Sequence, residues 1–164
     1  MNSYINGKNM NSDLIHKFYT AFQKRDWQTM NGCYHPEATF YDPAFRQLSI
    51  ADAKAMWHML CINAKDFELQ FSNVTSLGNT GSCDWQASYS FSKTGRKVNN
   101  HIQASFTFKD GLIISHKDEF DLWKWSQMAL GLTGLLLGWT PYLKNKINQN
   151  ALKSLKKFKQ ESSS

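Results

Sequence analysis

The sequence predicts an α+β fold in which N-terminal helices pack on one face of a long, strongly bent antiparallel sheet. Segments with helical periodicity come first, and four segments with alternating apolar and polar residues follow them. Short glycine-containing turns join these four, which is typical of antiparallel hairpins. The predicted long strands cover residues 67–77, 82–92, 97–109 and 112–121. Strands of about ten residues bend, so we expect a cup-shaped sheet.

Apolar residues at helical spacing predict the N-terminal helices. In the segment 12–25, Leu14, Phe18 and Phe22 recur every four residues and share one face. A later helix begins after Ser49, which can cap it with an acidic residue three positions on. The apolar face of that helix comprises Ala53, Met56, Trp57, Leu60, Cys61 and Ala64.

A short helix is predicted between these two. Asp26 can cap it, and Trp27, Met30 and Tyr34 are its larger side chains. Because proline cannot continue a helix, we expect it to stop at Pro36.

Alternation along the strands assigns their faces. A short strand at 38–42 ends at Pro43, ahead of the long ones. On the last long strand, parity places Asp118 with Ile114 and Phe120. The inward residues of the two preceding strands are Cys83, Trp85, Ala87, Tyr89, Phe91, Ile102, Ala104, Phe106 and Phe108.

Asp118 on an apolar face is the most informative feature, because a buried carboxylate is costly unless it is paired, protonated or used in chemistry. His116 shares its face, and Asp42 shares a face with Phe40. If the sheet encloses a cavity, two carboxylates and an imidazole point inward, where burial raises carboxylate pKa values and suits proton transfer. The alternative is that each group makes structural hydrogen bonds to backbone or Trp N–H groups.

Large aromatic residues on the inward faces can line an apolar ligand pocket, and core packing is the alternative role for each. The predicted ligand-contacting residues are Phe18, Phe40, Trp57, Trp85, Tyr89, Asn100, Ile102 and Phe120. The chain has no Gly-rich phosphate loop and no histidine–carboxylate spacing typical of a metal site, so we expect neither cofactor nor metal.

Composition indicates one folded domain with a full core, since 41% of the 164 residues are hydrophobic. The odd number of cysteines, Cys33, Cys61 and Cys83, favours reduced, buried thiols. Residues 1–11 are polar and lack the apolar core of a signal peptide, so we expect a cytoplasmic protein.

The net charge of +6 lies entirely in the last part of the chain. Residues 1–121 hold 12 Lys/Arg and 12 Asp/Glu, whereas residues 122–164 hold seven Lys and one Glu. A neutral domain body argues against nucleic-acid binding. A basic tail that contacts something anionic stays open.

The tail has two parts. Residues 128–139 are apolar but too few to span a bilayer, which needs roughly 20. A helix is expected after Pro141, with lysines around a stripe of Leu143, Ile147, Ala151, Leu155 and Phe158. This pattern fits a membrane-surface helix. It also fits a packed helix with a solvated lysine face, which we favour.

The order of elements, with Tyr41-Asp42-Pro43 and Asp118-Glu119-Phe120-Asp121, resembles the SnoaL-like branch of the nuclear transport factor two-like superfamily. The resemblance covers about residues 10–125. It implies a cone in which a bent sheet wraps around helices and holds a ligand. It also implies a homodimer through the outer sheet face, where Gln86, Ser88, Gln103 and Ser105 lie.

The resemblance also narrows the chemistry. Asp42 resembles the general base of ketosteroid isomerases, but the oxyanion-hole tyrosine and aspartate of those enzymes fall on Phe18 and near Ala104. Asp118 resembles one carboxylate of limonene epoxide hydrolase, whose arginine and second aspartate fall on Trp85 and Ala87. Polyketide cyclases need mainly a pocket and a positioned acid or base, and they remain open.

We therefore expect a cone domain at residues 1–125 and a helical extension at 126–164 that packs on or beside it. The expected function is binding of a small apolar molecule in the cone, with isomerase, cyclase or hydrolase chemistry at Asp42, Asp118 and His116. The alternatives are a ligand-binding or dimerisation module without catalysis, and membrane association through the basic C-terminal helix.

Overall fold

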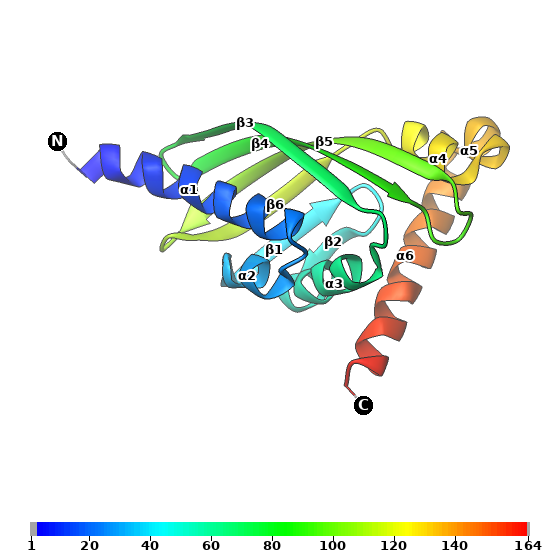
Figure 1. Cartoon of the computed structure of the whole chain (residues 1–164), viewed down its shortest axis with the longest axis horizontal. Helices are drawn as coiled ribbons and strands as arrows, with labels where there is room; N and C mark the ends of the chain where they lie inside the picture. Colours follow the sequence, from blue (N-terminus) through cyan, green and yellow to red (C-terminus); the bar gives the residue numbers. More distant parts are fainter. Residues whose placement is uncertain (1–2, 164) are drawn as a thin grey trace.

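The structure is a computed structural model that describes the backbone of residues 3–163 and the side chains of residues 10–163. Helices α1 and α2, strands β1 and β2, helix α3, four long strands and a helical C-terminal segment follow one another along the chain (Figure 1). The helices are α1 (Ser3–Gln23), α2 (Trp27–Gly32), α3 (Ile50–Asn63), α4 (Leu122–Leu130), α5 (Leu132–Leu137) and α6 (Pro141–Glu161). The strands are β1 (Tyr34–Asp42), β2 (Arg46–Ser49), β3 (Glu68–Leu77), β4 (Thr80–Ser90), β5 (Lys97–Lys109) and β6 (Leu112–Glu119).

Within the described residues the strands form one sheet in the order β2-β1-β6-β5-β4-β3. The hairpins from β3 to β6 are antiparallel as the turns predict, and β1 adds to β6 in parallel. Helices α1 to α3 lie under the concave face (Figure 1), so the predicted α+β cone is confirmed. The main core sits between that face and these helices, with Phe18, Trp57 and Phe40 fully buried.

The predicted caps are present where side chains can accept backbone hydrogen bonds. Asp26 accepts from Thr29 N at the start of α2, and Ser49 accepts from Asp52 N at the start of α3. Asp121 caps α4 in the same way. These short polar residues satisfy N–H groups that a helix start leaves unpaired.

The structure corrects the second helix. It ends at Gly32, and Tyr34 is the first residue of β1, which begins four residues earlier than expected. Pro36 therefore lies within a strand and does not stop the helix. Its position on β1 is exposed, where a missing N–H is tolerated.

The structure also corrects the position of Ile114, which was predicted to share the inward face of Asp118. Between Thr107 and Phe108 the register of β5 against β6 shifts by one residue, because Ile114 forms a bulge in β6. The bulge turns Ile113 into the core beside His116 and Asp118 and leaves Ile114 half-buried. A bulge of this kind inserts one residue and so breaks parity.

The C-terminal segment from α4 onwards packs against the open end of the cone. A second apolar cluster joins it to β5 and comprises Val98, Leu122, Trp125, Ala129, Leu143 and Ile147. Further along α6, Leu155 is buried in the main core. The ring centroids of Phe158 and of His58 on α3 lie 4.9 Å apart. The apolar stripe of α6 is thus used for packing. None of the described helices is long and apolar enough to cross a membrane.

Candidate active site

Four polar side chains from different strands face the inside of the cone near its open end. Asp118 comes from β6, Asn100 from β5, Tyr89 from β4 and Asp42 from the last position of β1. Asp118 and Asn100 are buried, and the other two are half-buried. We call these four residues the polar cluster. Sequence analysis predicted every member of it as a site residue.

A chain of hydrogen bonds runs from α3 to Asp118 through the core. Trp57 Nε1 donates to Tyr34 Oη at 2.9 Å, and Tyr34 Oη lies 2.7 Å from His116 Nδ1. His116 Nε2 lies 3.1 Å from Asp118 Oδ1, which also accepts from Trp85 Nε1 at 3.3 Å. His116 is 1% and Asp118 is 2% exposed, so water does not compete for these bonds.

The direction of each bond in this chain follows from the donors available. An indole nitrogen can only donate, so Tyr34 Oη accepts from Trp57 and its own proton is available for His116 Nδ1. Nδ1 is then the acceptor nitrogen, and Nε2–H donates to Asp118. The chain fixes one tautomer of the imidazole and aims a donor at the carboxylate.

His116 cannot meet a ligand directly, because aromatic side chains surround its ring. Ring centroids lie 4.5 to 6.0 Å away on Phe106, Phe40, Phe18, Trp57 and Tyr34. A group bound in the cone would interact with His116 through Asp118. Both bonds to Asp118 end on Oδ1, and among the described residues Oδ2 has no hydrogen-bond donor.

Asp42 sits in a tight loop that follows β1. Its Oδ1 accepts from Ala44 N at 2.9 Å and from Phe45 N at 2.5 Å. Burial nevertheless raises the pKa of Asp42 to about 7, and the charge of Asp118 adds to the rise while the two N–H groups oppose it. Asp42 can therefore hold or release a proton near neutral pH.

Tyr89 and Asn100 complete the polar cluster. Tyr89 Oη accepts from Trp125 Nε1 of α4 at 2.9 Å, and burial together with the charge of Asp42 raises the Tyr89 pKa. The side-chain amide of Asn100 makes no hydrogen bond with the part of the chain that the structure describes, although the residue is 8% exposed. This amide is therefore free to pair with a polar ligand atom at the open end of the cone.

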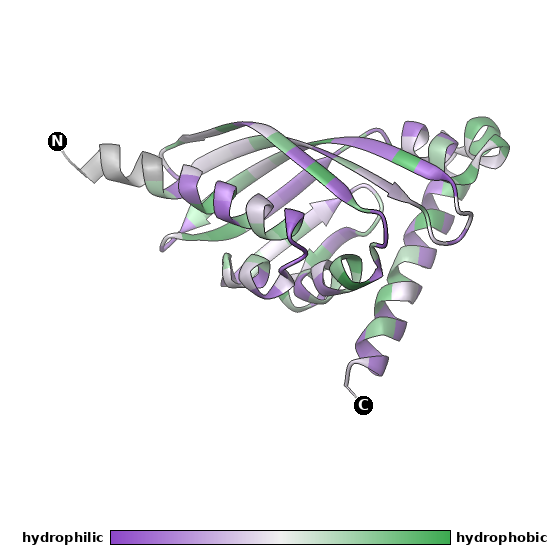
Figure 2. Ribbon diagram, in the orientation of Figure 1, coloured by the Kyte–Doolittle hydropathy of each residue, from purple (hydrophilic) through white to green (hydrophobic). Residues whose placement is uncertain are grey.

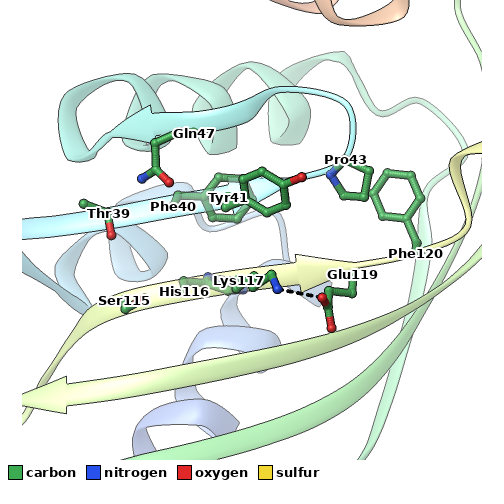
Figure 3. A pocket seen from close by; sticks show the side chains of 10 residues that line it. All are labelled: Thr39, Phe40, Tyr41, Pro43, Gln47, Ser115, His116, Lys117, Glu119 and Phe120. Carbon is green, nitrogen blue, oxygen red and sulfur yellow. Dashed lines mark ion pairs between the residues drawn. The ribbon is translucent and has the colours of Figure 1, made fainter. Parts of the chain in front are cut away.

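The outer face of the sheet carries two open hollows of about 550 Å³ each. One lies over β1, β2 and β6, where Thr39, Tyr41 and Gln47 face the paired Lys117 and Glu119 (Figure 3). The other lies over β3 to β6. Its polar lining comprises Gln70, Ser72, Asp84, Gln86, His101, Gln103 and Glu119.

Residues 15–116 match the family model of the SnoaL-like domain, which is more than half of the chain. The chain belongs to this family. The cone, the inward carboxylates and the parallel addition of β1 to β6 are thus features of a SnoaL-like protein. A search of curated proteins gives no match.

Solved structures share this fold at low sequence identity. An epoxide hydrolase from M. tuberculosis, described as LEH-like, is 16% identical with a TM-score of 0.63, and the match covers 80% of this chain and 98% of that one. TsrD from Streptomyces laurentii is 21% identical with a TM-score of 0.64, covering 76% and 97%. A candidate SnoaL-like polyketide cyclase from Jannaschia sp. CCS1 is 16% identical with a TM-score of 0.64, covering 74% and 92%.

The predicted ligand-contacting residues of this SnoaL-like chain lie at two depths. Phe18, Phe40 and Trp57 pack around His116 in the main core. Phe120 follows the end of β6, packs on the second apolar cluster and lines both outer hollows. The residues that lie on the inner face towards the open end are Trp85, Tyr89, Asn100 and Ile102.

Two tyrosines of the site, Tyr34 and Tyr19, are not among the residues that the sequence predicts. Tyr34 falls in the expected second helix, although it has the parity of Ala38 and Phe40 and so could have been placed on the inner face. Tyr19 falls on the apolar face of the first helix. Its hydroxyl is fully buried without a partner among the described residues, and burial and the charge of Asp118 raise its pKa.

No three His, Cys, Asp or Glu side chains gather as a metal site within the described part of the chain. The three cysteines are all buried free thiols.

Proposed function

We propose that this SnoaL-like protein binds a small, largely apolar molecule at the open end of the cone and transfers a proton to or from it. The observation that carries the proposal is the pair of inward carboxylates, Asp42 with a pKa of about 7 and Asp118 at the end of a buried hydrogen-bond chain. A carboxyl group with a raised pKa that faces a second, buried carboxylate from another strand is typical of acid–base catalysis.

Asp42 is the proposed general base. A carboxylate with a raised pKa is a stronger base than a free one and is still ionised in a large fraction of molecules at neutral pH. Asp118 is proposed to bind a polar group of the ligand through its unoccupied Oδ2. Trp85 and His116 hold its other oxygen, which makes His116 a positioning residue.

The residues around the site favour a substrate whose C–H bond is already acidic. Phe18 and Ala104 offer no hydrogen-bond donor to a developing oxyanion, and Ala87 offers no second carboxylate for water activation. A carboxylate base whose neighbours include the neutral side chains of Tyr89 and Asn100 suits a carbon that lies between two carbonyl groups. The proton would move to Asp42, and the electron pair would spread over both carbonyls. The carbanion would then form a C–C bond to a third carbonyl, whose π electrons move to its oxygen, and the proton held by Asp42 would return to that alkoxide.

The first test is deuterium incorporation into an aryl β-keto ester in D₂O, followed by NMR with the whole chain. Wild type is expected to accelerate the exchange, and Asp42→Asn is expected to lose at least about 100-fold of the acceleration. The matched control is Asp110→Asn, an identical change at an exposed turn residue with a backbone φ of 53° that asparagine tolerates. Exchange by Asp42→Asn at the wild-type rate would refute Asp42 as the base.

Ligand binding without catalysis is the second candidate function. It is favoured by the two backbone hydrogen bonds that already occupy Asp42 Oδ1 and by the aromatic side chains that fill the deep part of the cone. The same probe distinguishes the two functions. If it binds with equal affinity to wild type and Asp42→Asn, and neither accelerates exchange, the binding function holds.

Pairing of two copies through the outer sheet face is also proposed. The two hollows share Glu119 and Phe120 and together extend across the sheet, and their polar lining suits a hydrated interface. Light scattering after size-exclusion chromatography tests it. A dimer that dissociates in Gln103→Arg, a change at an exposed outer-face residue, supports the proposal, and a monomeric wild type contradicts it.

A further inference from the structure

A run of exposed apolar side chains lies on α5, on the turn that follows it and at the start of α6. Figure 2 shows this end of the molecule in green, beside the more polar α6. The side chains, with their exposed fractions, are Leu132 (75%), Leu135 (46%), Leu136 (66%), Leu137 (43%), Trp139 (60%) and Tyr142 (70%). We call these six residues the apolar tip. Contiguous apolar surface of this kind on a folded protein marks an interaction site.

The backbone of the apolar tip is closed by internal hydrogen bonds. Trp123 Nε1 donates to Leu135 O at 3.2 Å, and Trp139 Nε1 donates to Leu136 O at 3.2 Å. Thr140 N donates to Leu137 O at 2.9 Å. A helix end in water can leave these carbonyls to solvent, whereas a helix end in an apolar medium has to pair them. Because two indole groups pair these carbonyls without water, the tip meets the hydrogen-bonding requirement of an apolar medium.

The surroundings of the tip are positively charged. Residues 122–160 contain seven lysines and no Asp or Glu. Lys124 of α4 and Lys144 and Lys146 of α6 are exposed on the elements that flank α5. An apolar centre with exposed Trp and Tyr and a border of lysines matches the interface of a bilayer that contains anionic lipid.

We propose that the apolar tip inserts into the headgroup region of an anionic membrane and holds the cone at its surface. Helix α5 has six residues and is too short to cross, so the contact is peripheral. A second copy of the chain is the weaker candidate, because a symmetric contact between two tips would bring lysines together without acidic partners. The leucines and tryptophan of the tip carry this contact, since the stripe of α6 is already packed on the domain.

Vesicle flotation with the whole chain tests the proposal. Wild type is expected to float with vesicles of phosphatidylcholine and phosphatidylglycerol (7:3) and to bind pure phosphatidylcholine at least about tenfold more weakly. The double variant Leu132→Ser/Leu136→Ser is expected to lose at least about tenfold of the binding to the mixed vesicles. The matched control is Leu77→Ser, because Leu77 is 76% exposed at the end of β3, outside the tip.

Fluorescence quenching in wild type and in one tryptophan variant gives a second, independent readout of insertion. In wild type, brominated lipid is expected to quench tryptophan fluorescence, and Trp139→Phe is expected to reduce that quenching. This readout does not depend on the folding of the double variant. Wild type that stays with the aqueous phase, or equal loss of binding in Leu77→Ser, would overturn the proposal. The proposal would also be overturned if the tip joined two copies of the chain. In that case wild type would be a dimer that floats with neither type of vesicle, and only the double variant would be monomeric.

Discussion

Two opposing influences set the pKa of Asp42. The Pro43 ring begins a loop in which two backbone N–H groups turn back to the carboxylate and stabilise its charged form. Burial beside Asp118 outweighs them, so the pKa lies at about 7. The protonation state of this one side chain is therefore coupled to how tightly the open end of the cone is closed.

The coupling predicts a pH dependence of stability. The pKa of Asp42 is about 7 in the folded chain and has an ordinary value of 3.8, so the folded state binds the proton more tightly than the unfolded state. The free energy of unfolding should then be highest below pH ~4, fall between pH ~4 and ~7, and level off above. At about 1.4 kcal/mol per pKa unit, a difference of about three units corresponds to a fall of up to about 4 kcal/mol.

Asp42→Asn should abolish this fall, because asparagine keeps an oxygen acceptor for the two N–H groups but binds no proton. Urea unfolding of both proteins at several pH values measures it. The variant should gain up to about 4 kcal/mol relative to wild type between pH ~4 and pH ~8. Parallel curves for the two proteins would show that Asp42 titrates normally.

Tyr34→Phe is predicted to weaken the buried chain at two points. Trp57 Nε1 loses its acceptor and His116 Nδ1 loses its donor, so the free energy of unfolding should fall by about 1 to 3 kcal/mol. The ¹⁵N resonances of the imidazole should also shift, which loss of packing alone would not cause. Tyr41→Phe, on the outer face of the same strand (Figure 3), is the control and should leave both readouts unchanged.

At this scale the sequence predicted the inward carboxylates because strand parity is a local property. Asp118 and His116 fall on one face by counting alone. The partners of His116 were not predictable in this way. Tyr34 is 82 positions away in sequence, and the meeting of the two depends on β1 adding to β6 in parallel. No local pattern carries that pairing.

At the scale of elements, the α4–α5 corner depends on a close backbone approach. A Cβ on Gly134 would lie 1.8 Å from Ser126 O and 2.7 Å from Gln127 N, both on the preceding helix. Gly131 between the two helices has a backbone φ of 64°, which favours glycine. The two glycines let α5 fold back on α4 and so position the apolar tip.

Gly134→Ala is therefore expected to lower the free energy of unfolding by about 1 to 3 kcal/mol, because backbone atoms cannot move aside as a flexible side chain can. Thermal unfolding measures it, and vesicle flotation should show weaker binding. Gly32→Ala is the control, since a Cβ there meets nothing within 4 Å at the end of a helix. That change should be neutral or slightly stabilising. Equal stability of the two variants would refute the close approach.

The differences between predicted and observed elements have local causes. Strand β2 was missed because it has four residues, of which Leu48 alone is buried, so it shows no alternation. The sequence treats residues 128–139 as one apolar segment, because α5 is short and largely apolar and Gly131, which separates it from α4, does not reveal the corner. Strand β5, which alternates clearly from Lys97 to Lys109, was predicted to the residue, and the other long strands were predicted to within two residues at each end.

At the scale of the whole molecule, α6 connects the C-terminal end of the chain to the loop of Asp42. Asn148 Nδ2 donates to Ala44 O at 2.9 Å and to Phe45 O at 3.1 Å. These are the residues whose N–H groups bind the Asp42 carboxylate. The extension beyond the SnoaL-like match thus helps to hold the loop that carries the proposed base.

Asn148→Ala is predicted to lower the pKa of Asp42 from about 7 towards its ordinary value, because the loop loses its buried donor and admits water at the open end of the cone. A ¹³C titration of the side-chain carboxyl groups measures the pKa. The pH range over which stability falls should narrow by the same shift. Asn150→Ala, an exposed position on the same helix, is the control. If Asp42 titrates alike in both variants, α6 has no part in setting the pKa, and the cone domain alone determines the chemistry of its open end.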